Sequence, residues 1–226
     1  LGERHTVLGS FLWNGADNPV IFTRFEPDYL FDTGYRVPAL DQFGQYLWLG
    51  ITHIFLGYDH IAFLIALFFV RRFRDLVKII TAFSVAHTLT LALAALGVLA
   101  LPSRLVESAI AVSIVYVAAE NLWRRGEAPH RWRITFAFGL VHGFGFASVL
   151  RGLGLPAEGL VRSLLAFNLG VELGQLAIAA VCWPILLWVS RRPWSGRVRV
   201  VISGVLLAFG TAWLIDRVFA LRLMPI

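Results

Sequence analysis

The sequence predicts an all-α polytopic membrane protein, and two observations lead to that prediction. Of the 226 residues, 58% are hydrophobic and 15% are charged, an apolar share well above that of an ordinary soluble domain. The Lys and Arg residues fall in short clusters between long apolar runs, as the positive-inside rule describes for membrane proteins. The net charge of +6 therefore does not indicate a nucleic-acid partner.

Residues 1–42 differ from the rest of the chain because they are polar and interrupted by glycine and proline. Two short pieces of this segment, VLGSFLW and VIFTRF, have the residue types of β-strands. We expect an extracytoplasmic segment that leads into the first helix and can be the end of a larger N-terminal region.

The remaining residues, 43–226, are expected to form a six-helix transmembrane domain. A helix needs about 20 apolar residues to cross the hydrocarbon core. Six spans meet this need, and the first and fifth are long enough to tilt or break: 43–70, 76–100, 105–123, 134–150, 160–190 and 198–220.

Basic residues set the orientation of these spans. Four Lys or Arg residues follow each of the first, third and fifth spans: Arg71, Arg72, Arg74 and Lys78; Arg124, Arg125, Arg131 and Arg133; Arg191, Arg192, Arg197 and Arg199. This asymmetry predicts that both termini lie outside and that three basic loops face the cytoplasm. The predicted location is the bacterial inner (plasma) membrane.

Two kinds of chemistry are not expected. The sequence contains no GxxxxGK[ST] motif, so ATP hydrolysis by this chain is not predicted. Its single cysteine, Cys182, lies in an apolar run, which provides neither a disulfide framework nor a cysteine-based metal site.

Five titratable side chains lie near the middle of four predicted spans: Asp59, His60, His87, His142 and Glu172. A charge at the bilayer centre costs about 2.5 to 3.5 kcal/mol on insertion scales, so such groups should face inward and be paired. We therefore expect the five side chains to converge at one depth.

Helical spacing adds detail to two of these spans. His53 lies seven residues before His60, which places both on one face of a helix, two turns apart. In the fourth span, Gly139 and Gly143 flank His142. This spacing of small residues allows a neighbouring backbone to approach closely.

Further polar side chains accompany the titratable groups at helical spacing. These supporting residues are Ser84 and Thr88 in the second span, Glu120 at the inner end of the third, and Asn168 and Gln175 in the fifth. Three roles are open for Glu120: part of a cytoplasmic exit, a cap-like partner of a helix end, or a side chain on a solvated face.

Neutral imidazole and carboxylate groups together suit nickel, zinc, cobalt or iron. The predicted metal ligands are His53, Asp59, His60, His87, His142 and Glu172. The alternative is that these groups serve only as hydrogen-bonded packing elements. The sequence has no HExxH motif, so the metal hypothesis depends on shared depth and ligand chemistry.

The arrangement of His53, five residues and then Asp59-His60 resembles the His-x5-Asp-His motif in the first helix of HupE/UreJ proteins. The pieces TAFSVAHTLTLALAALG, VESAIAVSIVYVAAENL, FAFGLVHGFGFASVL and FNLGVELGQLAIAA are also similar to that family in order and spacing. The resemblance covers residues 43–220. It implies a small membrane permease for nickel or cobalt, linked to the supply of hydrogenase or urease, with metal-binding roles for His53, Asp59 and His60.

A second motif of the related permeases, approximately FHGxAHGxE, is present only in part. FGLVHGFGF keeps a Phe, a His and a Gly of this motif, at Phe138, His142 and Gly143, but it lacks the motif's first His and its Glu. The pattern is closer to a branch in which a six-helix unit follows an extracytoplasmic region.

Three functions are compatible with these residues. The leading hypothesis is a permease for a divalent metal ion of the nickel or cobalt type, with the lipid bilayer as surroundings and a homo-oligomer left open. The alternative is an intramembrane zinc-dependent hydrolase in which Glu172 or Asp59 acts as the base. A third is a sensory or assembly module whose outer segment binds the partner.

Overall fold

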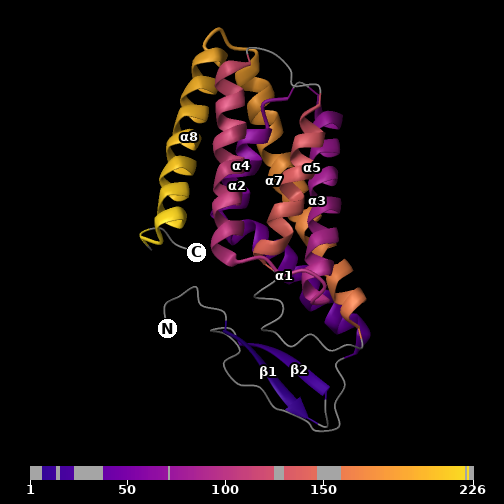
Figure 1. Cartoon of the computed structure of the whole chain (residues 1–226). Coiled ribbons are helices and arrows are strands. Elements are labelled where there is room, and N and C mark those ends of the chain that lie inside the picture. The colour runs from indigo at the N-terminus through magenta and orange to yellow at the C-terminus, as the bar shows by residue number, and fades with distance from the viewer. Residues whose placement is uncertain are drawn as a thin grey trace.

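The computed structural model describes residues 7–13, 16–22, 38–70, 72–124, 130–146, 159–221 and 223. Within these residues the chain is a helical bundle with a β-hairpin beyond one end (Figure 1). The elements are β1 Val7–Trp13, β2 Ala16–Phe22, α1 Ala39–Leu56, α2 Tyr58–Leu67, α3 Phe73–Ala95, α4 Ser103–Trp123, α5 Arg131–Gly145, α7 Leu160–Ser190 and α8 Ser195–Phe219.

The N-terminal segment contains the two strands as an antiparallel pair, with register from Val7 opposite Phe22 to Trp13 opposite Ala16. β1 has the bounds of the predicted piece VLGSFLW. β2 begins earlier than the predicted VIFTRF and includes Pro19, which a two-stranded sheet tolerates because both strands are edges. Residues 23–25 of that piece lie outside the described residues.

The first predicted span is broken into α1 and α2, whose axes differ by 72°. Gly57 lies between them with an extended backbone, φ −78° and ψ 99°. Other residues adopt these angles easily, so backbone freedom does not explain the glycine. A Cβ here would lie 2.7 Å from His60 Nδ1 and 2.9 Å from the His53 carbonyl oxygen. The break therefore needs a residue without a side chain.

Four described helices, α3, α4, α7 and α8, are long and apolar enough to cross a membrane. The broken pair α1 and α2 adds a fifth if it counts as one span. α5 has only 15 residues, and the end of the predicted fourth span, 147–150, lies outside the described residues. The all-helical membrane architecture is confirmed, while six spans and the outer location of both termini stay predictions.

Glycines set how closely the helices pack. α3 packs along α5, α1 along α7, and α4 along α8. A Cβ on Gly143 would lie 2.4 Å from the His87 carbonyl oxygen, and one on Gly170 would lie 2.1 Å from that of Leu47. Backbones can approach this closely only where small residues meet. The predicted close approach at Gly143 is present, and it brings α5 against the segment of α3 that carries His87.

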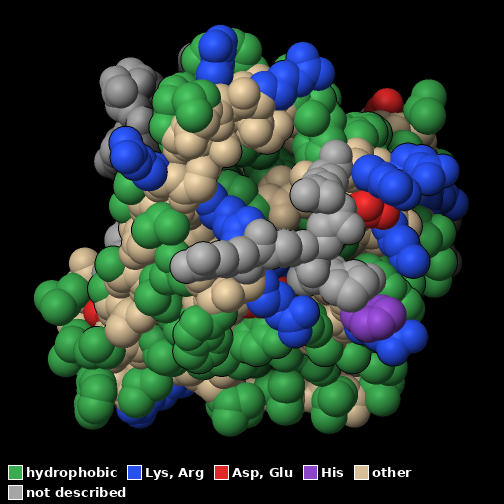
Figure 2. All heavy atoms as spheres, turned by 90° about the horizontal axis from the view of Figure 1, so that it is seen from above, with side chains coloured by type: hydrophobic (Ala, Val, Ile, Leu, Met, Phe, Trp, Pro, Cys, Tyr) green, Lys and Arg blue, Asp and Glu red, His purple; other side chains and the backbone are tan. Residues whose placement is uncertain are grey.

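Basic residues gather at the end of the bundle where α2 leads to α3, α4 to α5, and α7 to α8. Figure 2 looks onto this end and shows Lys and Arg side chains spread among apolar ones. Exposed tryptophans lie here too: Trp123, Trp188 and Trp194. We refer to it as the basic-loop end, and this combination of residues is typical of a membrane interface. Arg71 and Arg125 lie outside the described residues.

Candidate metal centre

Three histidines from three helices form the centre of the candidate site. His53 comes from α1, His60 from α2 and His87 from α3. One ring nitrogen from each lies within 4.8 Å of those of the other two. The imidazole rings of His53 and His60 are 4.6 Å apart, and those of His60 and His87 are 6.5 Å apart.

The break at Gly57 is what joins His53 to this group. On a continuous helix, seven residues would separate His53 from His60 by about 10.5 Å along the axis. The observed ring separation is 4.6 Å, because the chain changes direction by 72° between them. The prediction that the two lie two turns apart on one helical face is therefore wrong, and both line the inside of a bend.

His142 lies beside the three histidines. Its ring is 5.7 Å from that of His60 and 5.0 Å from that of Phe83. Its side chain is 2% exposed, so it faces the bundle interior from α5. The group within 4.8 Å contains His53, His60 and His87, which makes His142 a neighbour that would reach a shared ion only after a small approach.

Hydrogen bonds define the tautomer of three of the four imidazoles. Each points Nδ1 at an oxygen: His60 at Asp59 Oδ1 (2.9 Å), His87 at Asn168 Oδ1 (3.0 Å) and His142 at the Phe138 carbonyl (2.9 Å). The Asn168 amide is itself oriented, because its Nδ2 donates to the Leu164 carbonyl at 2.8 Å. Since these oxygens accept, Nδ1 carries the proton in each ring and the lone pair lies on Nε2.

The Nε2 atoms have no such partners. Within the described part of the chain, this nitrogen is buried and without a hydrogen bond in His53, His60, His87 and His142. An unpaired buried polar group costs about 1 to 3 kcal/mol. Histidines that bind a metal ion commonly donate one ring N–H to an oxygen and offer the lone pair of the other nitrogen to the metal. Three of the neighbouring rings of this site have that arrangement.

The distances also fit a metal ion. Two imidazole nitrogens that bind one ion at about 2.1 Å can lie at most about 4.2 Å apart. The nitrogens of His53, His60 and His87 lie within 4.8 Å of one another. Shifts of less than an ångström would therefore bring them close enough to bind one ion. The residues present therefore fit a divalent transition metal.

The two candidate carboxylates have different positions. Asp59 is 18% exposed and accepts a hydrogen bond from His60 Nδ1, which orients the ring. Glu172 is not a member of the close histidine group. Its Oε1 accepts a hydrogen bond from the Thr81 hydroxyl at 2.8 Å, across the contact between α3 and α7.

Three supporting polar residues of the second and fifth spans, Ser84, Asn168 and Gln175, join α3 to α7. Ser84 donates to Gln175 Oε1 at 3.2 Å, whereas Thr88 donates to the Ser84 carbonyl at 2.7 Å within α3. The Ser84–Gln175, His87–Asn168 and Thr81–Glu172 pairs form a polar seam between the two helices. Glu120 lies elsewhere, in an ion pair with Arg131.

Aromatic rings enclose the site on the side of His53. The Phe146 ring is 4.4 Å from the His53 ring, and Phe167 is 5.5 Å from it. The two phenyl rings stack on each other at 4.8 Å with planes 4° apart. An apolar wall therefore stands on this side of His53.

Sequence reasoning missed three contributors to these structures: Gly57, the Phe146–Phe167 wall and Arg131 as a buried partner of Glu120. A glycine two residues before Asp59 inside an apolar run was an available signal for a broken helix. The other two have no local signal, because each depends on a contact with another helix.

These features define an α-helical integral membrane protein with a buried histidine cluster between its helices. The sequence matches the family described as HupE / UreJ protein over residues 33–217, which is most of the chain. The chain therefore belongs to the HupE/UreJ family. No curated protein and no solved structure matches it.

Proposed function

We propose that the protein is a membrane permease for a divalent metal ion of the nickel or cobalt type. The observation that carries this proposal is the set of four neighbouring imidazoles whose Nε2 atoms are buried and unpaired within the described residues. Neutral imidazole is a good ligand for these ions. Membership of a family associated with nickel and cobalt supports the choice of ion.

In this proposal the ion is the transported substrate. His53, His60 and His87 are its first ligands and His142 the next to approach. Asp59 acts through His60, whose ring it orients. The ion enters from the side of the hairpin and leaves at the basic-loop end, in a bacterial inner membrane with the N-terminus outside.

Two contacts favour the permease over a zinc-dependent hydrolase. A hydrolase needs a carboxylate free to take a proton from metal-bound water. The Asp59 carboxylate is engaged by His60, and the Glu172 carboxylate accepts from Thr81 outside the histidine group. These contacts support the permease, because both carboxylates already accept a hydrogen bond. Zinc that stays stoichiometric through extensive chelation would favour the hydrolase instead.

Elemental analysis of purified protein after incubation with Ni²⁺ tests the site. We expect one bound ion per chain in the wild type and a loss of most of it in His87→Ala, because a central ligand is removed. His130→Ala is the matched control, since His130 is exposed at the basic-loop end. Equal metal content in wild type and His87→Ala would contradict the site.

Uptake of Ni²⁺ into proteoliposomes tests transport. The double variant His60→Ala/His142→Ala should abolish saturable uptake while His130→Ala leaves it intact. If the double variant transports as fast as the wild type, the histidine cluster is not the transport site. A wild type that binds Ni²⁺ but shows no uptake would exclude the permease function.

A further inference from the structure

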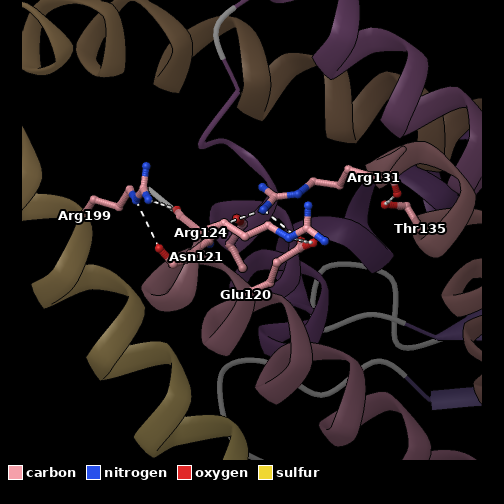
Figure 3. Close-up of polar contacts among 7 residues, drawn as sticks. Glu120, Asn121, Arg124, Arg131, Thr135 and Arg199 are labelled. Atoms are coloured by element: carbon pink, nitrogen blue, oxygen red, sulfur yellow. Dashed lines mark hydrogen bonds and ion pairs between the residues drawn. The ribbon is translucent and has the colours of Figure 1, made fainter. Parts of the chain in front are cut away.

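A buried ion pair closes the bundle at the basic-loop end. Arg131 at the start of α5 donates from Nη2 to Glu120 Oε2 at 3.0 Å and to Asn121 Oδ1 at 2.7 Å (Figure 3). The three side chains are 5%, 6% and 3% exposed, respectively. The charged groups are thus nearly as well enclosed as the hydrophobic core.

Backbone contacts extend this cluster to two further helices. Asn121 Nδ2 donates to the carbonyl of Ala66 in α2 at 2.8 Å. Arg199 at the start of α8 donates from Nε to the Asn121 carbonyl at 3.1 Å and also contacts the carbonyl of Arg124. The cluster therefore holds together the ends of α2, α4, α5 and α8.

The cluster lies in line with the candidate metal centre along α2. Six residues separate His60 from Ala66, a rise of about 9 Å on a helix. Aromatic rings fill the intervening layer: Phe63 is 5.5 Å from Phe83 and 6.0 Å from Phe138. An ion that leaves the histidines toward the basic-loop end would first meet this layer and then a buried guanidinium.

We propose that the Glu120–Arg131 pair is the gate of the ion path at the basic-loop end, with Arg131 as a tethered cation that blocks the exit of a metal ion. The inference rests on the proposed permease function. Like charges repel strongly where water is excluded, so Arg131 must move before a divalent cation can pass. Glu120 and Asn121 hold it in place while the gate is closed.

The contacts of Arg131 and Glu120 suit an ion pair that breaks and forms again. Arg131 Nε and Nη1 are buried without a hydrogen-bond partner within the described residues. Arg124 Nε lies 3.3 Å from Glu120 Oε1 and is on an exposed side chain. Arg124 can therefore keep Glu120 paired after Arg131 has left, which lowers the cost of opening.

Thiol accessibility tests the gate without any transport measurement. Ala66 is fully buried, so Ala66→Cys in a Cys182→Ser background should react slowly with a hydrophilic maleimide in detergent solution. Adding Glu120→Gln should speed the reaction at least tenfold, because Arg131 loses its charged partner. Asp75→Asn, which removes an exposed carboxylate at the same end, should leave it unchanged. Equal rates in all three proteins would overturn the gate.

Release of Ni²⁺ from preloaded proteoliposomes supplies the second arm. Glu120→Gln should release the ion several-fold faster than the wild type while its bound Ni²⁺ in detergent stays at the wild-type level. The reversed pair Glu120→Arg/Arg131→Glu should return the rate toward the wild-type value. If Glu120→Gln releases Ni²⁺ and reacts with the maleimide at the wild-type rates, the gate is refuted but the permease function is not. A wild-type protein without any Ni²⁺ flux would refute the permease function.

A purely structural role for the pair predicts a different result. In that case Glu120→Gln would react faster with the maleimide, but it would also bind less Ni²⁺ and unfold at a lower temperature. This combination would reject the gate. Arg131→Lys keeps the charge but loses the forked geometry. It should label at a rate between those of the wild type and Glu120→Gln.

Discussion

At the residue scale, the centre depends on which nitrogen of each imidazole is free. His87 shows this most fully, because its side chain has no exposed surface and its Nδ1 is bound to Asn168. The Asn168 amide is oriented in turn by the Leu164 carbonyl. A chain of two hydrogen bonds therefore holds Nδ1 of His87 and leaves Nε2 as the nitrogen that can bind an ion.

Loss of Asn168 should weaken metal binding although Asn168 is not itself a ligand. We expect Asn168→Ala to lower Ni²⁺ affinity about 10- to 100-fold, the usual effect of removing the group that orients a histidine ligand. Isothermal titration calorimetry of the purified protein measures this. Gln175→Ala is the matched control, because Gln175 lies on the same helix and contacts Ser84 instead of a histidine. Similar affinities in the two variants would contradict the assigned role.

Protons should compete with the metal for the same nitrogens. Imidazole must be neutral to bind an ion, so binding releases or excludes protons. We expect Ni²⁺ affinity, measured by the same titration, to fall as the pH is lowered through the range in which histidine becomes protonated. An affinity that stays constant down to the lowest pH at which the protein remains folded would contradict histidine ligands.

At the element scale, the bend between α1 and α2 assembles the site. The two helices meet at 72°, and the turn of chain between them presents His53 and His60 to the same space. The bend is compact because His60 Nδ1 and Asp59 Oδ1 occupy the volume beside Gly57 that a side chain would fill.

A methyl group at position 57 should disrupt this bend. In Gly57→Ala the Cβ would lie 2.7 Å from His60 Nδ1 and 3.0 Å from Asp59 Oδ1, so His60 must move. We expect bound Ni²⁺, measured by elemental analysis, to drop by more than half. In Gly44→Ala, in α1, the Cβ meets no atom within 4 Å, and this variant should bind normally. A Gly57→Ala protein with full metal content would show that the bend tolerates a side chain.

The α1–α7 contact offers a test of packing. In Gly170→Ala the Cβ would lie 2.1 Å from the Leu47 carbonyl oxygen, and backbone on both sides leaves no flexible group to yield. Overpacking of this kind costs about 1 to 3 kcal/mol, so the midpoint of thermal unfolding should fall. Gly204→Ala in α8 meets nothing within 4 Å and should be neutral or slightly stabilising, because alanine is the better helix former.

At the scale of the whole molecule, charge and hydropathy divide the bundle into two ends. The basic-loop end carries the Arg and Lys side chains (Figure 2), and three exposed tryptophans lie at the same end. The hairpin lies beyond the opposite end (Figure 1). If the basic loops are cytoplasmic, the ion path proposed above runs from the outer side to the cytoplasm.

Labelling of single cysteines in intact cells tests this orientation. In a Cys182→Ser background, Ser10→Cys in the hairpin should react with a membrane-impermeant maleimide. Gly196→Cys, at the exposed start of α8, should react only after the cells are broken. The opposite pattern would reverse the direction assigned to the path.

The sequence by itself determined the helical membrane architecture, the basic end of the bundle and the family. Apolar length and loop charge act on each span separately, so they can be read without knowing which helices touch. The histidines, too, could be identified one by one, since a buried imidazole in an apolar run needs a partner.

Only the tertiary structure decided which of these groups meet. It placed His53 with His60 and His87 through the bend at Gly57, and it held Glu172 at Thr81, away from the close histidine group. It also turned Arg131 from a predicted loop residue into a buried partner of Glu120. These outcomes depend on contacts between helices that are distant in sequence, and helical periodicity within one span carries no information about such contacts.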